Sequence, residues 1–159
     1  MKQIINSYFK NKAATNLSVK QATINDAFFV RRIFFQNKVA LHSEDISLSE
    51  WKEILSVKDA DEKHFIMCDD ATPVGYMKIN GLLSQKEAWI SMLFVAKEYH
   101  RQGIGSFALS YAEGFVKLHN IKSLKIQTDV DNIPAINCYL KCGYQICDKG
   151  KKIRFSKEL

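Results

Sequence analysis

A glycine-containing segment has the residue types that bind phosphate groups. Gly103, Ile104, Gly105 and Ser106 follow a polar stretch and open a helical pattern, and Arg101 adds a cation just before them. Glycines let backbone amides approach a ligand closely, and the first N–H groups of a helix are unpaired and carry partial positive charge. The segment indicates a phosphate or pyrophosphate site, although an ordinary tight turn before a helix would use the same glycines.

Two nucleotide-binding patterns compete for this segment and fit it poorly. Residues 103–108 formally match the G-x-G-x-x-[GA] dinucleotide fingerprint, with Asp129 after the next expected strand. In that fold the strand runs almost directly into the first glycine, whereas seven residues separate Val95 from Gly103 here. Too little chain follows for the second half of a dinucleotide sheet. A Walker-type loop is absent, because the sequence contains no Gly-Lys-Ser or Gly-Lys-Thr.

A second segment supplies a tyrosine and an asparagine at characteristic spacing. Residues 131–144 read DNIPAINCYLKCGY, in which Asn132, Tyr139 and Gly143 follow N-x-x-A-x-x-x-Y-x-x-x-G-[FY]. Residues 100–105, HRQGIG, fit [RQ]-x-x-G-x-[GA] except that His100 replaces Arg or Gln. With these two motifs in order, the chain from Val19 to about Tyr144 resembles the GNAT superfamily of acetyl-CoA-dependent N-acetyltransferases.

The resemblance implies a fold, a reaction and a set of residues. The implied fold is a mixed α/β GNAT-like acyl-CoA N-acyltransferase fold, with a mostly antiparallel central sheet flanked by helices. The implied reaction moves an acetyl group from acetyl-CoA to a primary amine, with Tyr139 as general acid at the sulfur. Asn132 would contact the pantetheine arm, and the glycine loop would hold the pyrophosphate. The cofactor-binding residues implied in this way are Leu93, Phe94, Val95, His100, Arg101, Gln102, Gly103, Ile104, Gly105, Ser106, Asn132 and Tyr139.

The general base is harder to place. Many members of the family have an acidic residue at the position that Trp89 occupies here. Glu87 lies two residues earlier, on the same face of the expected strand, and is the candidate base, directly or through water. An exposed glutamate at a strand end with no catalytic role is the competing interpretation. His42 and His64 have no partner that the sequence identifies, so neither is assigned a role.

Charge is strongly segregated along the chain. The net charge is +6, yet residues 41–70 hold nine acidic residues and three lysines, so this block carries −6 and the remainder +12. In the resembled family the acceptor lies against the first two helices and their connection, which places Glu44, Asp45 and Trp51 as substrate-binding residues. A basic remainder suits a phosphate-rich cofactor, and an acidic rim would attract a cationic acceptor such as a polyamine, an aminoglycoside or a peptide amine. Solvated charged faces are the plain alternative.

Hydrophobic periodicity predicts the elements that position these residues. Helices are expected at residues 27–41, 48–57, 104–118 and 134–141, and strands at 18–22, 64–68, 74–82, 88–95, 124–128, 144–147 and 152–155. The three strands between 64 and 95 are separated by turn residues and should form an antiparallel meander. At 159 residues the chain is about one domain long, which we place at 17–159 after an N-terminal extension, residues 1–16.

Composition excludes several classes of protein. The longest nearly apolar run covers nine residues, whereas a membrane-spanning helix needs about 20. With no secretory signal pattern, a cytoplasmic address is expected, with the four cysteines reduced and no metal site. No zinc-finger or RNA-recognition signature supports the basic charge as a nucleic-acid site. An acyl-CoA-binding module without turnover remains an alternative to the enzyme, and a nucleic-acid-binding protein is a weaker alternative. The sequence does not decide whether the protein forms a homodimer.

Overall fold

The computed structural model describes residues 16–41, 44–84 and 86–159. The expected N-terminal extension and His42 therefore lie outside the described residues, apart from Asn16. The first strand begins directly after it, at Leu17.

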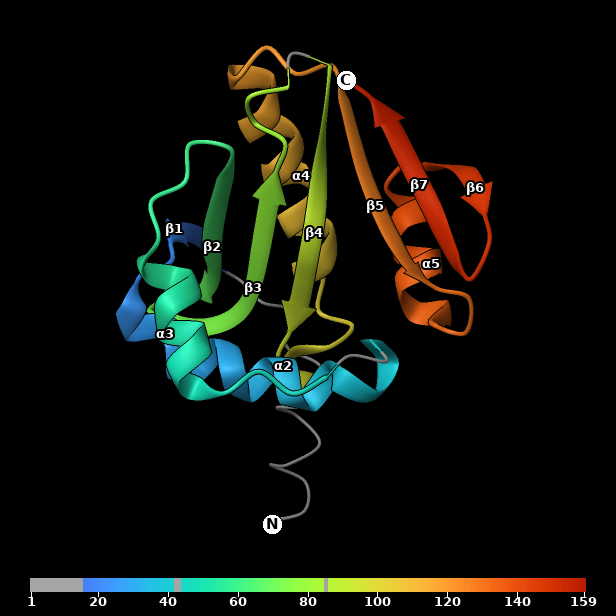
Figure 1. The fold of residues 1–159 in the computed structure, drawn as a ribbon. Coiled ribbons are helices and arrows are strands. Elements are labelled where there is room, and N and C mark those ends of the chain that lie inside the picture. The colour runs from blue at the N-terminus through green and yellow to red at the C-terminus, as the bar shows by residue number, and fades with distance from the viewer. Residues whose placement is uncertain (1–15, 42–43, 85) are drawn as a thin grey trace.

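The described residues form one mixed sheet of seven strands in the order β1-β2-β3-β4-β5-β7-β6 (Figure 1). Strands β4 and β5 run parallel and every other neighbouring pair is antiparallel. The strands are β1 (Leu17–Gln21), β2 (Glu62–Asp69), β3 (Thr72–Asn80), β4 (Glu87–Val95), β5 (Ser123–Asp129), β6 (Gln145–Lys149) and β7 (Lys152–Glu158). The expected meander of β2, β3 and β4 is confirmed.

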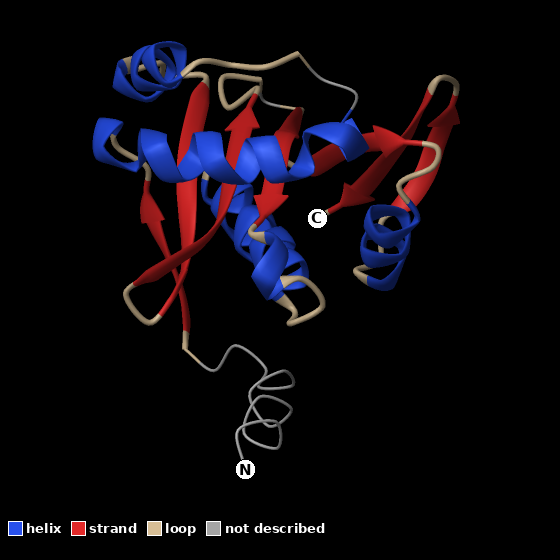
Figure 2. Cartoon of the chain, turned by 90° about the horizontal axis from the view of Figure 1, so that it is seen from below, coloured by secondary structure: helices blue, strands red, loops and turns tan. Residues whose placement is uncertain are grey.

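Helices cover both faces of this sheet. They are α2 (Ala27–Leu41), α3 (Leu48–Ser56), α4 (Ile104–Leu118) and α5 (Ile133–Lys141), with single 3₁₀ turns η2 (Ile24–Asp26) and η3 (Lys97–Tyr99). One apolar core lies between the sheet and α4, and a second lies between the sheet and the α2–α3 pair. The view from below shows α4 on the side of the sheet opposite α2 and α3 (Figure 2).

Local signals in the sequence explain where the helices begin. Ser47 accepts a hydrogen bond from the Glu50 amide while the Glu50 carboxylate accepts one from the Ser47 amide, a reciprocal cap that starts α3. The apolar stripe of α4 faces the core through Ile104, Ala108 and Ala112. The four predicted helices are confirmed to within a residue at each end, and the two 3₁₀ turns went unpredicted.

Strands β4 and β5 pair over only the first part of their length. Their register runs from Glu87 opposite Ser123 to Ile90 opposite Ile126 and then ends. On the other side, the β3 register skips from Met92 to Ile90, which leaves Ser91 as a bulge. Figure 1 shows the two strands adjacent at the top and diverging downward, toward the loop before α4. The second half of β4 therefore has a strand neighbour on one side only.

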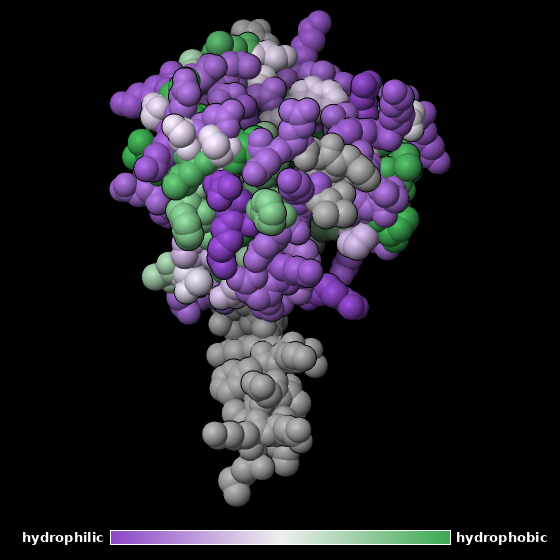
Figure 3. Space-filling model, turned by 60° about the horizontal axis from the view of Figure 1, so that its bottom comes forward, coloured by the Kyte–Doolittle hydropathy of each residue, from purple (hydrophilic) through white to green (hydrophobic). Residues whose placement is uncertain are grey.

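The surface around α2 is mixed in character. Phe28 and Phe35 of α2 are largely exposed, and the space-filling view from this side shows hydrophobic side chains scattered among hydrophilic ones (Figure 3). The longest helices in the described ranges have 15 residues, and none of them is long and apolar enough to cross a membrane.

Candidate active site

The unpaired part of β4 offers backbone hydrogen-bonding groups. The Ala96 amide donates to the Val74 carbonyl at 2.8 Å, which makes Gly75 and Val95 a non-hydrogen-bonded pair of the antiparallel ladder. The N–H and C=O groups of Val95 therefore point away from β3, and by alternation those of Leu93 do too. Because β5 has already diverged, these groups face the space between the two strands.

The glycine loop turns through two left-handed residues before α4 begins. Arg101 has φ 64° and Gly103 has φ 84°, and Gly103 is the N-cap of α4. The first intrahelical bond runs from the Phe107 amide to the Gly103 carbonyl, so the amides of Ile104, Gly105 and Ser106 have no partner within the helix. Three such N–H groups at a helix start, beside the divergence of β4 from β5, fit an anionic group such as pyrophosphate.

His100 fastens the loop to the end of β4. Its Nε2 lies 2.9 Å from the Val95 carbonyl oxygen and donates to it, since a carbonyl only accepts. Asn37 of α2 donates to the same oxygen at 3.2 Å, and Gln102 donates to the Glu98 carbonyl at 3.2 Å. The exposed His100 side chain is therefore bonded to the strand end, and the Val95 amide remains the freer of that residue's two groups.

Helix α5 packs against the start of α4 through Cys138, which immediately precedes Tyr139. A Cβ added to Gly105 would lie 3.4 Å from Sγ of Cys138, and Ser106 Oγ lies 3.8 Å from the same sulfur. Tyr139 is 7% exposed and packs edge-on against Phe155, with ring centroids 5.2 Å apart. Burial raises the pKa of its hydroxyl well above the ordinary value, so the group keeps its proton at neutral pH.

Asn132 caps α5 and ties it to the end of β5. Its Oδ1 accepts from the Ala135 amide at 3.4 Å, and its Nδ2 donates to Thr128 Oγ1 at 3.0 Å. Asn132 thus holds the helix that carries Tyr139 at a fixed place beside the sheet.

Several residues expected in the site lie elsewhere or lack free groups. Glu87 begins β4, six residues and about 20 Å of extended strand before Leu93, where it pairs with Lys125. Its role as general base therefore stays a prediction, which the distance from Leu93 and the pair with Lys125 do not favour. The Phe94 side chain is 3% exposed and its backbone pairs with β3, so neither its ring nor its backbone groups are available to a ligand. The Ile104 side chain is likewise buried, and only its amide is available.

The structure places the predicted acceptor residues of the acidic block in different surroundings. Trp51 is fully buried between Phe34 and Tyr76, with ring centroids 5.6 and 5.7 Å away, so it has no surface for a substrate. Asp45 pairs with Arg31 at 3.7 Å. Glu44 is exposed on the connection between α2 and α3. Neither carboxylate lines the pocket described below.

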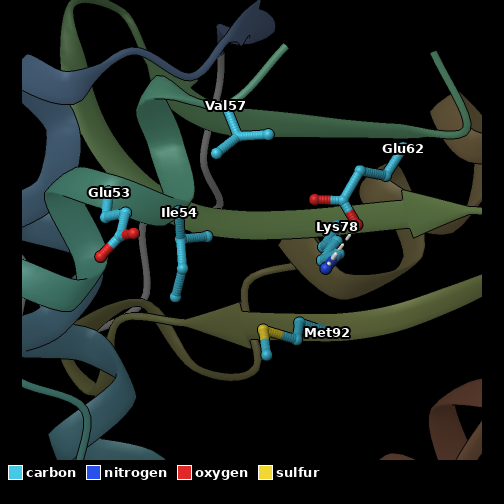
Figure 4. A pocket seen from close by; sticks show the side chains of 6 residues that line it. All are labelled: Glu53, Ile54, Val57, Glu62, Lys78 and Met92. Atoms are coloured by element: carbon cyan, nitrogen blue, oxygen red, sulfur yellow. Dashed lines mark ion pairs between the residues drawn. The ribbon is translucent and has the colours of Figure 1, made fainter. Parts of the chain in front are cut away.

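A pocket of about 310 Å³ lies beside the diverging part of β4 (Figure 4). It is lined by Glu53, Ile54, Val57, Glu62, Lys78 and Met92. Met92 immediately precedes Leu93, so the pocket adjoins the strand segment whose backbone groups are free. The acidic residues that reach this position are Glu53 of α3 and Glu62 of β2, which sequence reasoning counted only as part of the acidic block.

A chain of polar side chains connects this pocket to the core. The hydroxyl of Tyr76 lies 2.7 Å from His64 Nδ1, His64 Nε2 lies 3.0 Å from Glu62 Oε1, and Lys78 Nζ lies 2.7 Å from Glu62 Oε2. Burial lowers the pKa of His64. Although burial alone would raise the pKa of Glu62, the hydrogen bonds from Lys78 and His64 hold it below its ordinary value. We call Tyr76, His64, Glu62 and Lys78 the polar chain. Period-two spacing places Glu62 and His64 on one face, which is the signal that could have found them.

The cysteines form no disulfide among the described residues. Cys68, Cys138, Cys142 and Cys147 are free thiols. Within the described ranges, no three His, Cys, Asp or Glu side chains gather as metal ligands would.

Comparisons with known proteins agree with this geometry. The Acetyltransferase (GNAT) family model matches residues 27–144. Streptothricin acetyltransferase of Escherichia coli is 25% identical over 130 residues, which cover 75% of this chain and 71% of that protein.

Solved structures of other acetyltransferases share the fold. An acetyltransferase from Thermus thermophilus superposes with TM-score 0.80 at 18% identity, covering 93% of this chain and all of the other. A spermidine N-acetyltransferase from Vibrio cholerae, solved with CoA and spermine, also gives TM-score 0.80, at 16% identity over 90% of this chain and 95% of its own. Since the family model spans most of the chain, from the start of α2 to the end of the second motif, the protein belongs to the acetyltransferase (GNAT) family, whose enzymes are acyltransferases that take the acetyl group from acetyl-CoA.

Proposed function

We propose that the protein transfers an acetyl group from acetyl-CoA to a primary amine of a cationic acceptor, a small molecule or a peptide. The observation that carries this proposal is the divergence of β4 from β5 after Ile90, between the glycine loop and α5. This opening has free amides at one end, free strand backbone along one side and Tyr139 nearby.

Different groups of the protein bind different parts of acetyl-CoA. The backbone groups of Leu93 and the amide of Val95 bind the pantetheine arm as an added strand would be bound. The amides of Ile104, Gly105 and Ser106 bind the pyrophosphate, and Arg101 adds positive charge. When bound, acetyl-CoA would supply an activated thioester carbonyl for attack by an uncharged amine, whose nitrogen loses a proton to solvent water as the C–S bond breaks.

Tyr139 donates the proton that the departing thiolate needs. Its raised pKa keeps the hydroxyl protonated at neutral pH, and its rigid packing against Phe155 fixes the ring. His100 and Asn132 act through other residues: His100 holds the loop against β4, and Asn132 holds α5.

The acceptor enters from the pocket beside Met92. Its two carboxylates, Glu53 and Glu62, outnumber its one cation, Lys78, which favours a positively charged acceptor over an acidic one. Two of the acceptors named for similar proteins, streptothricin and spermidine, are cationic, whereas a third, phosphinothricin, is not.

The test is a thiol-release assay with acetyl-CoA and a panel of amines. The panel holds spermidine, an aminoglycoside, streptothricin, a lysine-containing peptide and an acidic amine such as glutamate. We expect release above the hydrolysis rate with at least one cationic amine, and a rate that falls with ionic strength. Turnover confined to glutamate, insensitive to salt, would contradict the cationic acceptor, and no turnover at all would contradict the enzyme.

A further inference from the structure

The pocket has a carboxylate toward each end and an apolar middle. Figure 4 shows Glu53 and Glu62 on opposite sides, with Ile54, Val57 and Met92 between them. Methylene groups pack against such a middle, and ammonium groups pair with such ends. The lining therefore has the pattern of an aliphatic chain that carries separated positive charges.

Glu62 is held in place more firmly than a surface carboxylate. It accepts hydrogen bonds from His64 and Lys78, and its side chain is 22% exposed. His64 is 7% exposed and is itself fixed by the Tyr76 hydroxyl. Polar side chains that lie in or near the core cost stability unless each of them is paired. The polar chain is fully paired and ends at the pocket, which points to a role in binding a ligand in that pocket.

We propose that the Glu62 carboxylate binds an ammonium group of the acceptor. His64 is the positioning residue for this carboxylate. Lys78 stays paired with Glu62, so the acceptor and Lys78 share the same carboxylate. The inference rests on the proposed function and narrows the acceptor to an aliphatic polyamine that has two positive charges separated by methylene groups in addition to the uncharged amine that reacts. Glu53 pairs with the second charge.

The stereochemistry of a carboxylate allows this sharing. A carboxylate has about four lone-pair positions, of which His64 and Lys78 use one each. An incoming ammonium group binds one of the remaining lone-pair positions, but the positive charge of Lys78 repels it. Removal of Lys78 changes the pocket from two carboxylates and one cation to two carboxylates alone, which should strengthen binding of a multiply charged acceptor.

The first experiment measures binding without turnover. Spermidine, and butylamine as a singly charged comparison, are titrated calorimetrically into the full-length protein saturated with CoA. We expect spermidine to bind at least tenfold more tightly than butylamine. We expect Glu62→Gln to weaken spermidine about tenfold or more while CoA affinity changes less than twofold, because a charged partner is replaced by a neutral one of equal size.

Two further variants separate a binding role from a structural one. Lys78→Met keeps the length of the side chain and removes its charge, and we expect spermidine to bind about threefold more tightly or better. Asp148→Asn is the matched control, since it neutralises a carboxylate paired with Arg154 at 3.2 Å on the β6–β7 hairpin, outside the pocket. It should leave both affinities unchanged.

His64 is tested by the pH dependence of the same binding. The charged or titratable groups around it are Glu62 and Lys63 on β2, and Tyr76 and Lys78 on β3, with Glu53 on the α3 side of the pocket. Protonation of His64 adds a cation beside Glu62, so spermidine affinity should fall as the pH drops through the folded pKa of His64, which burial holds below its ordinary value. His64→Gln, which retains a donor for Glu62, should abolish this decline.

Each outcome decides the inference separately from the proposed function. Unchanged spermidine affinity in Glu62→Gln, weaker binding in Lys78→Met, or equal binding of spermidine and butylamine overturns the inference. Should the wild type bind neither amine yet release thiol with another member of the amine panel, the inference fails while the proposed function stands. Absence of thiol release with every amine removes the proposed function itself.

Discussion

The hydroxyl of Tyr76 lies 2.7 Å from Nδ1 of His64, inside the core between the sheet and α3. Because the Glu62 carboxylate accepts from Nε2, that nitrogen carries the proton of the neutral ring, and Nδ1 accepts from Tyr76. The pair thus fixes the tautomer of a histidine that would be free to choose either on the surface. A neutral His64 is the form that the fold accommodates best.

This pairing predicts a loss of stability in mild acid. Burial lowers the pKa of His64 in the folded protein below the ordinary value of 6.5, which applies to the unfolded chain. Between these two pKa values the unfolded chain binds more protons, so the free energy of unfolding falls as the pH falls. Glu62, whose folded pKa is also lowered, adds a second loss once the pH passes below about 4.5. Chemical denaturation between pH 8 and 5 should show the first decline in the wild type and a smaller one in His64→Gln. A wild-type stability independent of pH over this range would refute the buried neutral histidine.

Tyr139→Phe should separate chemistry from binding. Removal of the hydroxyl removes the proposed proton donor, and general acid catalysis contributes about 10²- to 10⁴-fold. We expect kcat to fall about 10²-fold, with the dissociation constant of acetyl-CoA within threefold of the wild type. Tyr144→Phe is the matched control, because its ring centroid lies 6.4 Å from that of Tyr139 and its hydroxyl is buried. Equal kcat values for Tyr139→Phe and wild type would exclude Tyr139 as the acid.

Arg101→Gly tests the loop at a strained position. The left-handed backbone of Arg101 costs a non-glycine residue about 1–2 kcal/mol, while glycine loses about 0.5–1 kcal/mol through its freer unfolded chain. Stability should therefore stay equal or rise slightly. Affinity for acetyl-CoA should fall about three- to tenfold at low salt and less at high salt, since a cation near the pyrophosphate is lost. Thermal unfolding and calorimetry measure the two effects, and tighter binding in the variant would place Arg101 outside the cofactor site.

Trp51→Phe distinguishes a core residue from a substrate contact. Trp51 is fully buried and its indole Nε1 has no hydrogen-bond partner among the residues that the structure describes, so the change removes volume and none of the hydrogen bonds seen there. We expect a loss of about 1–2 kcal/mol in the free energy of unfolding, from the cavity that remains. The KM of the acceptor should change less than twofold at temperatures where the variant is folded. A large change in KM with unaltered stability would return Trp51 to the acceptor site.

Much of the fold could be predicted because local signals agree with one another. The stripe from Ile104 to Val116 and the cap at Ser47 each specify an element without reference to the rest of the chain. The two motifs were equally visible, and Gly105 lies against Cys138 as their association requires. The divergence of β4 from β5 could not be predicted from the sequence, because the pairing of two distant strands does not change the hydrophobic periodicity of either strand.

The features of the site that the sequence could not show have a common physical origin. Period-two spacing correctly placed Glu87 and Trp89 on one face, but it said nothing of how far along β4 the strand parts from β5. The aromatic Trp51 in an acidic segment was compatible with either a binding surface or a core, and only its contacts with Phe34 and Tyr76 decide between them. Depth and distance along a strand are properties of the assembled sheet.

Calorimetric titration of the purified wild-type protein with acetyl-CoA and with free CoA, after removal of any carried-over cofactor, tests the central claim most directly. The free amides of α4 and the unpaired backbone of β4 predict one site per chain for each, with a dissociation constant in the micromolar range. Absence of binding to either would contradict the account, because the glycine turn would then be a structural turn alone.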